Sequence, residues 1–138
     1  MNLLKRLSFL LLLGVFALSC GDDEGGIDSG LFATWTKVRT ELRDCANPSD
    51  NSSTSDPCTA QDCLKITLTD DLRYTMTTTV RGQDQVEQGQ VQIGETQINF
   101  LPDNTTGSTR YGYTLNSTTL TLINENSVIC TEAFVYNK

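Results

Sequence analysis

The 138-residue sequence contains no histidine and few basic residues. Without histidine, the chain lacks the usual general base of hydrolytic triads and the commonest metal ligand. Ten Lys and Arg residues stand against seventeen Asp and Glu residues, and the formal net charge is −7. Proteins that bind nucleic acid gather Lys and Arg against the phosphates, so this balance argues against a nucleic-acid partner.

The sequence also lacks an apolar run long enough to cross a bilayer. The uncharged, leucine-rich stretch from Leu7 to Ser19 has thirteen residues, whereas a transmembrane helix needs about 20. The stretch follows the basic pair Lys5 and Arg6 and ends at Cys20. This order is typical of a secretory signal peptide.

Around the cleavage point, Ala17-Leu18-Ser19-Cys20 resembles the lipobox of bacterial lipoproteins. In that family a peptidase cuts just before a cysteine that already carries diacylglycerol. The resemblance implies that residues 1–19 are a lipoprotein signal peptide and that Cys20 is the lipid attachment site. Two or three acyl chains on Cys20 would anchor the protein stably in a membrane. The alternative is an ordinary signal peptide cleaved near Ser19, which leaves a free thiol.

Residues 20–30 are rich in glycine and acid and have little to bury, so we expect a flexible tether. Asp22-Asp23-Glu24 resembles the acidic export signal that sends some Gram-negative lipoproteins to the outer face of the outer membrane. The alternative is a solvated linker. We expect a protein of the bacterial cell envelope, lipid-anchored in the outer membrane, with the leaflet undetermined.

From Leu31 to Lys138 the dominant signal is alternation of apolar and polar residues, which predicts an all-β domain. Residues 91–100 and 113–122 share one template, two apolar pairs separated by a four-residue gap, which predicts two tight hairpins. If Gly94-Glu95 forms a II′ turn and Asn116-Ser117 a I′ turn, the apolar side chains of each hairpin fall on one face. Under these turns Val91 lies opposite Ile98, and Tyr113 lies opposite Leu120.

Another hairpin pairs Ile66–Leu68 with Tyr74–Met76 across a turn that contains Asp70-Asp71. The run that starts at Tyr74 then reaches a turn at Arg81–Gln85. To keep the apolar side chains before and after this turn on the same face of the sheet, we expect four residues between the paired ends of the turn, or a bulge at Gly89.

An opening strand at Thr34–Arg43 and a closing strand at Val128–Tyr136 bring the total to eight. Eight antiparallel strands in meander order leave the first and last edges unpaired unless those two strands pair with each other. We therefore predict a small eight-stranded antiparallel up-and-down barrel over residues 31–138. The alternative is a β-sandwich.

Three short motifs carry a family resemblance. Leu31-Phe32-Ala33-Thr34-Trp35 resembles the L-x-G-x-W opening of lipocalin-like domains. Residues 68–75 are similar to the family hairpin F-x-x-D-G-T-Y-T, with Leu72 where a glycine would take a positive φ. Residues 113–122 resemble the hairpin W-x-L-x-G-x-x-L-x-L. The resemblance implies a lipocalin-like barrel with room for a small apolar ligand.

With Cys20 assigned to lipid, four cysteines remain in an exported chain, and disulfides are their expected fate. The spacing C-x12-C-x4-C followed by a distant cysteine is a poor zinc pattern, so we expect no metal. In the predicted barrel all four cysteines gather at one rim, with residues 46–62 arching over it. This geometry favours Cys45 with Cys130 and Cys58 with Cys63, while Cys63 with Cys130 stays open.

The predicted inward-facing residues are mostly large and apolar. They are Trp35, Ile66, Leu68, Tyr74, Met76, Val91, Ile93, Ile98, Phe100, Tyr111, Tyr113, Leu115, Leu120 and Leu122. Five of them are candidates to line a small apolar ligand near the cysteine rim: Trp35, Tyr74, Met76, Tyr111 and Tyr113. The alternative is a filled core and a non-enzymatic structural or envelope-complex module, and a cavity of about 300 Å³ or more would favour binding.

We expect no enzyme activity and no cofactor. Glycosidase chemistry needs two carboxylates across a cleft, yet most Asp and Glu residues lie in the tether, in residues 46–62 or in turns. Glu87 and Glu132 lie on predicted strands, and a lone carboxylate on a strand is more often solvated than catalytic.

Overall fold

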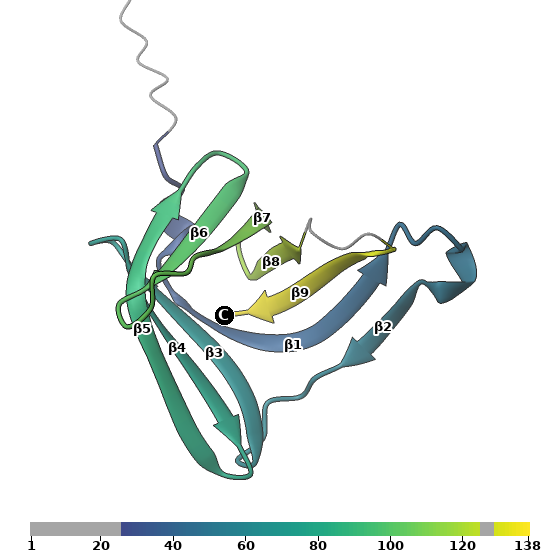
Figure 1. The fold of residues 1–138 in the computed structure, drawn as a ribbon, viewed down its shortest axis with the longest axis horizontal. Coiled ribbons are helices and arrows are strands. Elements are labelled where there is room, and N and C mark those ends of the chain that lie inside the picture. The colour runs from purple at the N-terminus through teal and green to yellow at the C-terminus, as the bar shows by residue number, and fades with distance from the viewer. Residues whose placement is uncertain (1–25, 125–128) are drawn as a thin grey trace, which may run out of the picture.

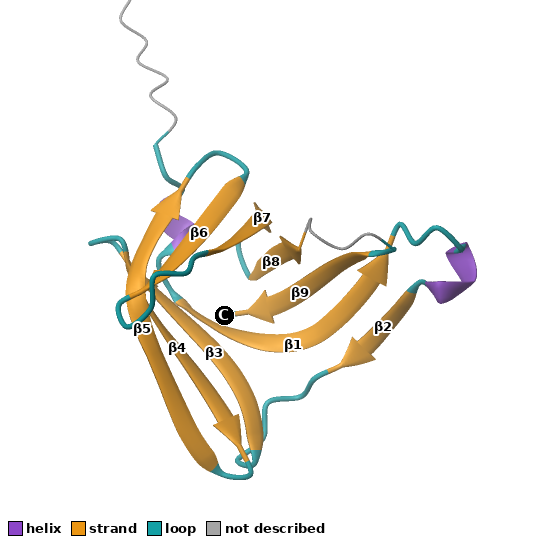
Figure 2. Cartoon of the chain, viewed as in Figure 1, coloured by secondary structure: helices purple, strands orange, loops and turns teal. Residues whose placement is uncertain are grey.

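The computed structural model describes residues 26–124 and 129–138. The predicted signal peptide, Cys20, the first part of the tether and Val128 lie outside these residues. Figure 1 shows the order of the strands, and Figure 2 shows how little helix accompanies them. Within the described ranges, no helix has the length and apolar character needed to cross a membrane.

The chain consists of nine strands and two short 3-10 helices in the described part. The elements are η1 (Ser29–Leu31), β1 (Thr34–Arg43), η2 (Pro48–Asp50), β2 (Ser52–Ser55), β3 (Asp62–Thr69), β4 (Arg73–Val80), β5 (Gln83–Ile93), β6 (Gln97–Pro102), β7 (Thr109–Leu115), β8 (Thr119–Asn124) and β9 (Thr131–Asn137). All strand pairs are antiparallel, and β1 pairs with β9 from Thr36–Asn137 to Arg43–Thr131. This pairing closes the barrel, as predicted, and excludes the sandwich.

Strand β2 was not predicted. It pairs with β1 from Arg39–Ser55 to Leu42–Ser52, so part of residues 46–62 returns along β1 instead of arching over the rim. All four residues of β2 are exposed serine or threonine, and such a segment has no apolar alternation by which a strand is recognised. The barrel therefore has eight strands with one extra strand beside them.

The hairpin at β3–β4 has the predicted pairing of Leu68 with Tyr74, and Leu72 has a φ of 60°. The turn between β4 and β5 differs from its prediction, because only Arg81 and Gly82 separate the paired residues Val80 and Gln83. Both turn residues have positive φ values, 53° and 75°, as a I′ turn requires. A two-residue turn keeps the apolar residues in phase as a four-residue turn would, so no bulge is needed.

Two hairpin registers also differ from the prediction, each by two residues. Val91 pairs with Phe100 instead of Ile98, and Tyr113 pairs with Leu122 instead of Leu120. The backbone amide of Asn116 bonds to the Thr119 carbonyl, so the turn residues lie one position later than expected. A shift of two residues preserves the face of every side chain, and the predicted inward set survives the error.

All fourteen predicted inward residues lie in the core or pack against it. The most buried core side chains also include Leu31 and Tyr136, which the prediction did not list. Leu31 belongs to η1, and its carbonyl accepts a 2.9 Å hydrogen bond from Trp35 Nε1. η1 packs Leu31 into the end of the barrel where Trp35 lies, and we call this end of the barrel the closed end.

Gly89 in β5 shows how tightly the wall of the barrel is packed. A Cβ atom at this position would fall against the Leu101 carbonyl oxygen and 2.6 Å from Tyr74 Cε1. Glycine is therefore required here for the Tyr74 ring to lie directly over the backbone of β5. The ring of Tyr74 also meets Phe100 edge to face at 5.0 Å.

Candidate functional site

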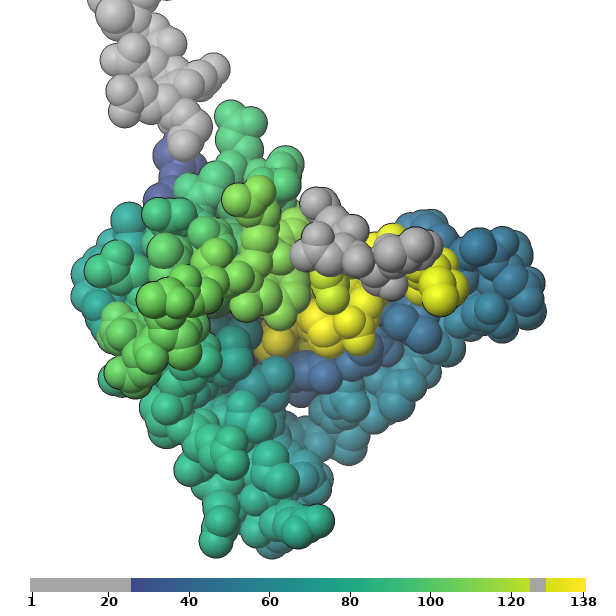
Figure 3. Space-filling model, in the orientation of Figure 1, coloured from purple at the N-terminus to yellow at the C-terminus, as the bar shows by residue number. Residues whose placement is uncertain are grey.

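Strands β1 and β3 separate partway along the barrel. They pair only from Thr34–Thr67 to Thr36–Lys65. Beyond a register shift between Lys37 and Arg39, the edge of β1 that faced β3 pairs with β2. Figure 3 shows the resulting notch between strands β3–β5 in teal and β1–β2 in blue.

A cavity of about 510 Å³ occupies this separation. Its lining combines two apolar side chains and a disulfide sulfur with four hydroxyl groups and three charged groups. The lining residues are Lys37, Ser55, Asp56, Pro57, Thr59, Asp62, Cys63, Leu64, Thr78 and Thr79. A cavity with a mixed polar and apolar lining thus lies beside the Cys58–Cys63 disulfide.

Lys37 is the cation of this cavity. Its Nζ lies 3.1 Å from Asp56 Oδ2 and 5.2 Å from the centre of the Phe134 ring, and 19% of the side chain is exposed. The Asp56 carboxylate also accepts a 2.7 Å hydrogen bond from Thr40 Oγ1. This hydrogen bond, followed by the Lys37 ammonium, lowers the pKa of Asp56, while partial burial opposes the shift. Asp56 is therefore held as an anion on β1.

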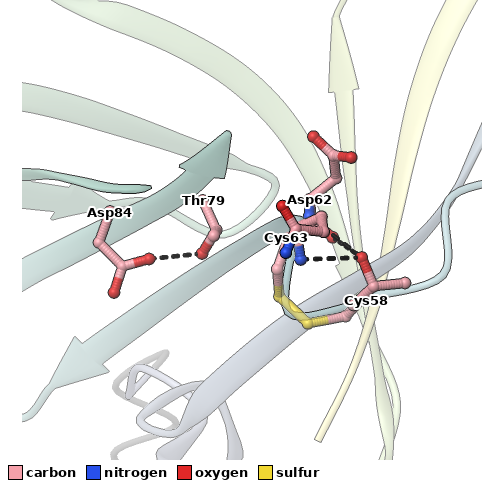
Figure 4. Close-up of a disulfide and its surroundings, with 7 residues drawn as sticks. Cys58, Asp62, Cys63, Thr79 and Asp84 are labelled. Atoms are coloured by element: carbon pink, nitrogen blue, oxygen red, sulfur yellow. Dashed lines mark hydrogen bonds between the residues drawn. A yellow bond between two sulfur atoms is a disulfide. The ribbon is translucent and has the colours of Figure 1, made fainter. Parts of the chain in front are cut away.

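Residues 56–62 form one wall of the cavity, and we call this segment the strap. Its first residue donates a backbone hydrogen bond of 2.8 Å from Asp56 N to Val38 O on β1. Farther along, Cys58 forms a disulfide with Cys63 at the start of β3. The Thr59 amide bonds to the Asp62 carbonyl at 2.9 Å, and Figure 4 shows this turn beside the disulfide. The strap thus connects the two strands that have separated.

The second disulfide joins Cys45, after β1, to Cys130, before β9. The two bridges are therefore the pairs that the sequence analysis favours. The four cysteines do not share one rim, however, because Lys65 is level with Thr36 and Cys45 lies far beyond that level along β1. Because β1 and β3 separate, the two disulfides lie at different levels along the barrel.

The five candidate ligand-lining residues lie in the filled part of the barrel or outside the cavity. Trp35 is fully buried in the closed end, and the Tyr74 hydroxyl donates a 2.7 Å hydrogen bond to Glu87 Oε1. Met76 packs half-buried against the core, and the half-buried Tyr111 ring meets Phe134 edge to face at 6.1 Å. The Tyr113 hydroxyl donates to Gly94 O. None of the five lines the cavity between β1 and β3, whereas Tyr113 lines a separate hollow of about 490 Å³ beside Ile27 and Ile93.

Burial governs the ionisation of the tyrosines. It raises the pKa of all four: Tyr74, Tyr111, Tyr113 and Tyr136. A nearby carboxylate adds to the effect at three of them, Glu87 in the case of Tyr74. These hydroxyls remain protonated hydrogen-bond donors at neutral pH and are not candidates for a catalytic base.

The sequence analysis missed Lys37, Asp56 and Leu64 as cavity residues. Lys37 is two residues from Trp35, and this spacing places both side chains on the same face of a strand. This spacing predicts that Lys37 faces inward, but Lys37 is not among the inward-facing residues predicted above because that set contains apolar and aromatic residues alone. In the part of the chain that the structure describes, no three metal-ligating side chains come together.

No protein-family model matches the sequence, and no curated protein matches it. Among solved structures, the chain is similar to a lipocalin-like protein from Bacteroides uniformis, with a TM-score of 0.59 and 11% sequence identity. The similarity covers 79% of this chain and 98% of that chain. The fold is therefore that of a lipocalin-like barrel.

Proposed function

We propose that this chain is a lipid-anchored protein of the bacterial outer membrane whose lipocalin-like barrel binds a small amphipathic ligand between β1 and β3. The observation that carries the proposal is the cavity of about 510 Å³ beside the filled core. Ligand-binding cavities usually measure about 300–1,000 Å³. A hollow of the same volume lies beside Phe32 and Leu68 at the closed end. We place the ligand where β1 leaves β3 because the lining there combines apolar, hydroxyl and charged groups.

The lining indicates the chemistry of the ligand. Leu64 and Pro57 offer apolar contact, and the hydroxyl of Thr78 offers a hydrogen bond, whereas the Thr79 hydroxyl already donates to Asp84 Oδ1. The single ammonium in the lining is already paired with a carboxylate. This combination suits a compact molecule with an apolar body and uncharged hydrogen-bonding groups.

A fluorescent apolar probe, 1-aminoanthracene, tests the cavity. Thr78 lines the cavity, so Thr78→Phe should obstruct it and weaken the binding and the fluorescence of the probe. Thr75 lies on the opposite face of β4, where its Oγ1 accepts a 3.3 Å hydrogen bond from Gln88 Nε2, and Thr75→Phe is the matched control. Equal probe binding by both variants and the parent protein would refute the site.

The membrane anchor is tested separately. Native mass spectrometry of protein purified from its own membrane should show acyl mass on Cys20 together with any retained ligand. Cys20→Ala should release the protein from the membrane fraction. An unmodified Cys20 in the mature protein would refute the anchor and leave the barrel proposal intact.

A filled-core module for protein contacts is the second candidate, and the dense closed end favours it. Such a module would bind no small probe at the cavity, and Thr78→Phe would not alter its contacts. The probe experiment therefore separates the two candidates.

A further inference from the structure

We infer that the Cys58–Cys63 disulfide is a reducible clasp, which holds the strap of residues 56–62 against β3 and keeps the side of the cavity closed. The other disulfide, Cys45–Cys130, is a structural link that stays oxidised when the clasp opens. The consequence for ligand retention rests on the function proposed above, whereas the motion of the strap does not.

The two disulfides differ in accessibility. Cys58 is exposed and Cys63 is half-buried, whereas Cys45 is buried, with 7% exposed, and Cys130 is half-buried. Reduction begins with attack of a thiolate on a disulfide sulfur, so an accessible bridge reacts sooner than a buried one. A dithiol reductant therefore reaches Cys58 first.

The reaction balances with a dithiol as the reductant. One thiolate of the reductant attacks Cys58 Sγ, the Cys58–Cys63 bond breaks, and Cys63 leaves as a thiolate that takes up a proton. The second thiolate of the reductant then attacks the mixed disulfide and releases Cys58. Two cysteine thiols and one oxidised, disulfide-bonded reductant result.

The strap continues into β3 through the backbone, and within the described residues the Cys58–Cys63 bridge is the covalent cross-link that reduction removes from it. Six of the ten cavity-lining residues, Asp56, Pro57, Thr59, Asp62, Cys63 and Leu64, lie on the strap or directly after it. β1 and β3 do not pair beside this segment, so no ladder holds β1 against β3 there once the strap moves. Between residues 56 and 61 the strap keeps single hydrogen bonds and the Lys37–Asp56 ion pair, and its last residue, Asp62, pairs with Val80 in the β3–β4 ladder.

Asp56 is the positioning residue at the other end of the strap. Its backbone amide bonds to Val38 O, and its carboxylate is bonded by Thr40 and Lys37. Asp62 lines the same cavity and is exposed, yet it bonds to Thr59 through its backbone amide and carbonyl rather than through its carboxylate. Asp62→Asn is therefore a matched control for Asp56→Asn.

Hydrogen exchange of the full-length protein tests the clasp without a ligand. In Cys58→Ser/Cys63→Ser the strap amides, including Asp56 N–H, should exchange about tenfold faster or more, whereas the amides of β4–β5 should not change. Asp56→Asn should accelerate the same amides, and Asp62→Asn should not. Unchanged exchange in the double serine variant would overturn the inference.

Stepwise reduction with dithiothreitol tests the selectivity. Alkylation and mass mapping should find Cys58 and Cys63 labelled at reductant concentrations that leave Cys45 and Cys130 unlabelled. Labelling of all four together would overturn the inference. With 1-aminoanthracene, the double serine variant should release the probe faster than the parent protein. If the exchange result holds and no probe binds to either protein, the proposed function fails and the clasp stands.

Discussion

The disulfide between Cys45 and Cys130 should supply about twice the stability of the one between Cys58 and Cys63. The first joins residues 85 apart in the sequence, and the second joins residues 5 apart. The chain-entropy model gives about 4.6 kcal/mol for the large ring and about 2.2 kcal/mol for the small one. Replacing each pair by serine should lower the free energy of unfolding by these amounts.

These losses are a substantial fraction of the stability of a typical domain, which is about 5–15 kcal/mol. The strand pair that the large ring closes also has a continuous ladder between β1 and β9, so the variant without Cys45–Cys130 should still fold. Its loss of stability arises mainly because the unfolded chain gains freedom.

Urea unfolding at equilibrium measures both losses. Trp35 is the only tryptophan of the chain and is fully buried, so its fluorescence reports the closed end of the barrel. Far-UV circular dichroism should give the same midpoint if unfolding is two-state. A loss for Cys58→Ser/Cys63→Ser equal to or greater than that for Cys45→Ser/Cys130→Ser would refute the reasoning.

Three further predictions follow from the packing and ionisation of named groups. Gly89→Ala should destabilise the barrel by about 1–3 kcal/mol because its methyl group has no space beside Tyr74, and urea unfolding measures this loss. Burial raises the pKa of Tyr74 and Tyr136; stability should therefore fall above about pH 10, where only the unfolded chain loses these protons, and tyrosinate absorbance near 295 nm should appear together with unfolding. Neighbouring donors lower the pKa values of Asp56 and Glu41; the stability that these carboxylates contribute should be lost as the pH falls below about 4, and Asp56→Asn should reduce this acid dependence in a thermal melt.

The strand order and the core could be predicted because alternation in a meander leaves few arrangements that bury one face. The turns were harder, as Asn116 shows. Its side chain accepts hydrogen bonds from the backbone amides of Thr118 and Thr119, so it precedes the turn instead of occupying it. Asn favours both roles, and the sequence alone does not distinguish them.

The cavity could not be predicted, because it depends on where two strands stop pairing. Nothing in the composition of β1 shows that it exchanges β3 for β2 after Lys37. The polar strap can be recognised as a wall of the cavity only when this change of partner strand is known. Its disulfide was favoured because the first and last barrel strands were expected to be neighbours, which pairs Cys45 with Cys130 and leaves Cys58 for Cys63, but its contribution to a cavity wall was not predicted.

The packing of η1 has a mechanical consequence. The chain enters the barrel at the end where Leu31 is buried and bonded to Trp35, whereas the notch lies where β1 and β3 diverge. A force applied upstream of Gly26 would thus be borne by the densest part of the molecule. Under the proposed function, the opposite end of the barrel can then deform around a ligand while Leu31 and Trp35 hold the segment that leads to the proposed anchor.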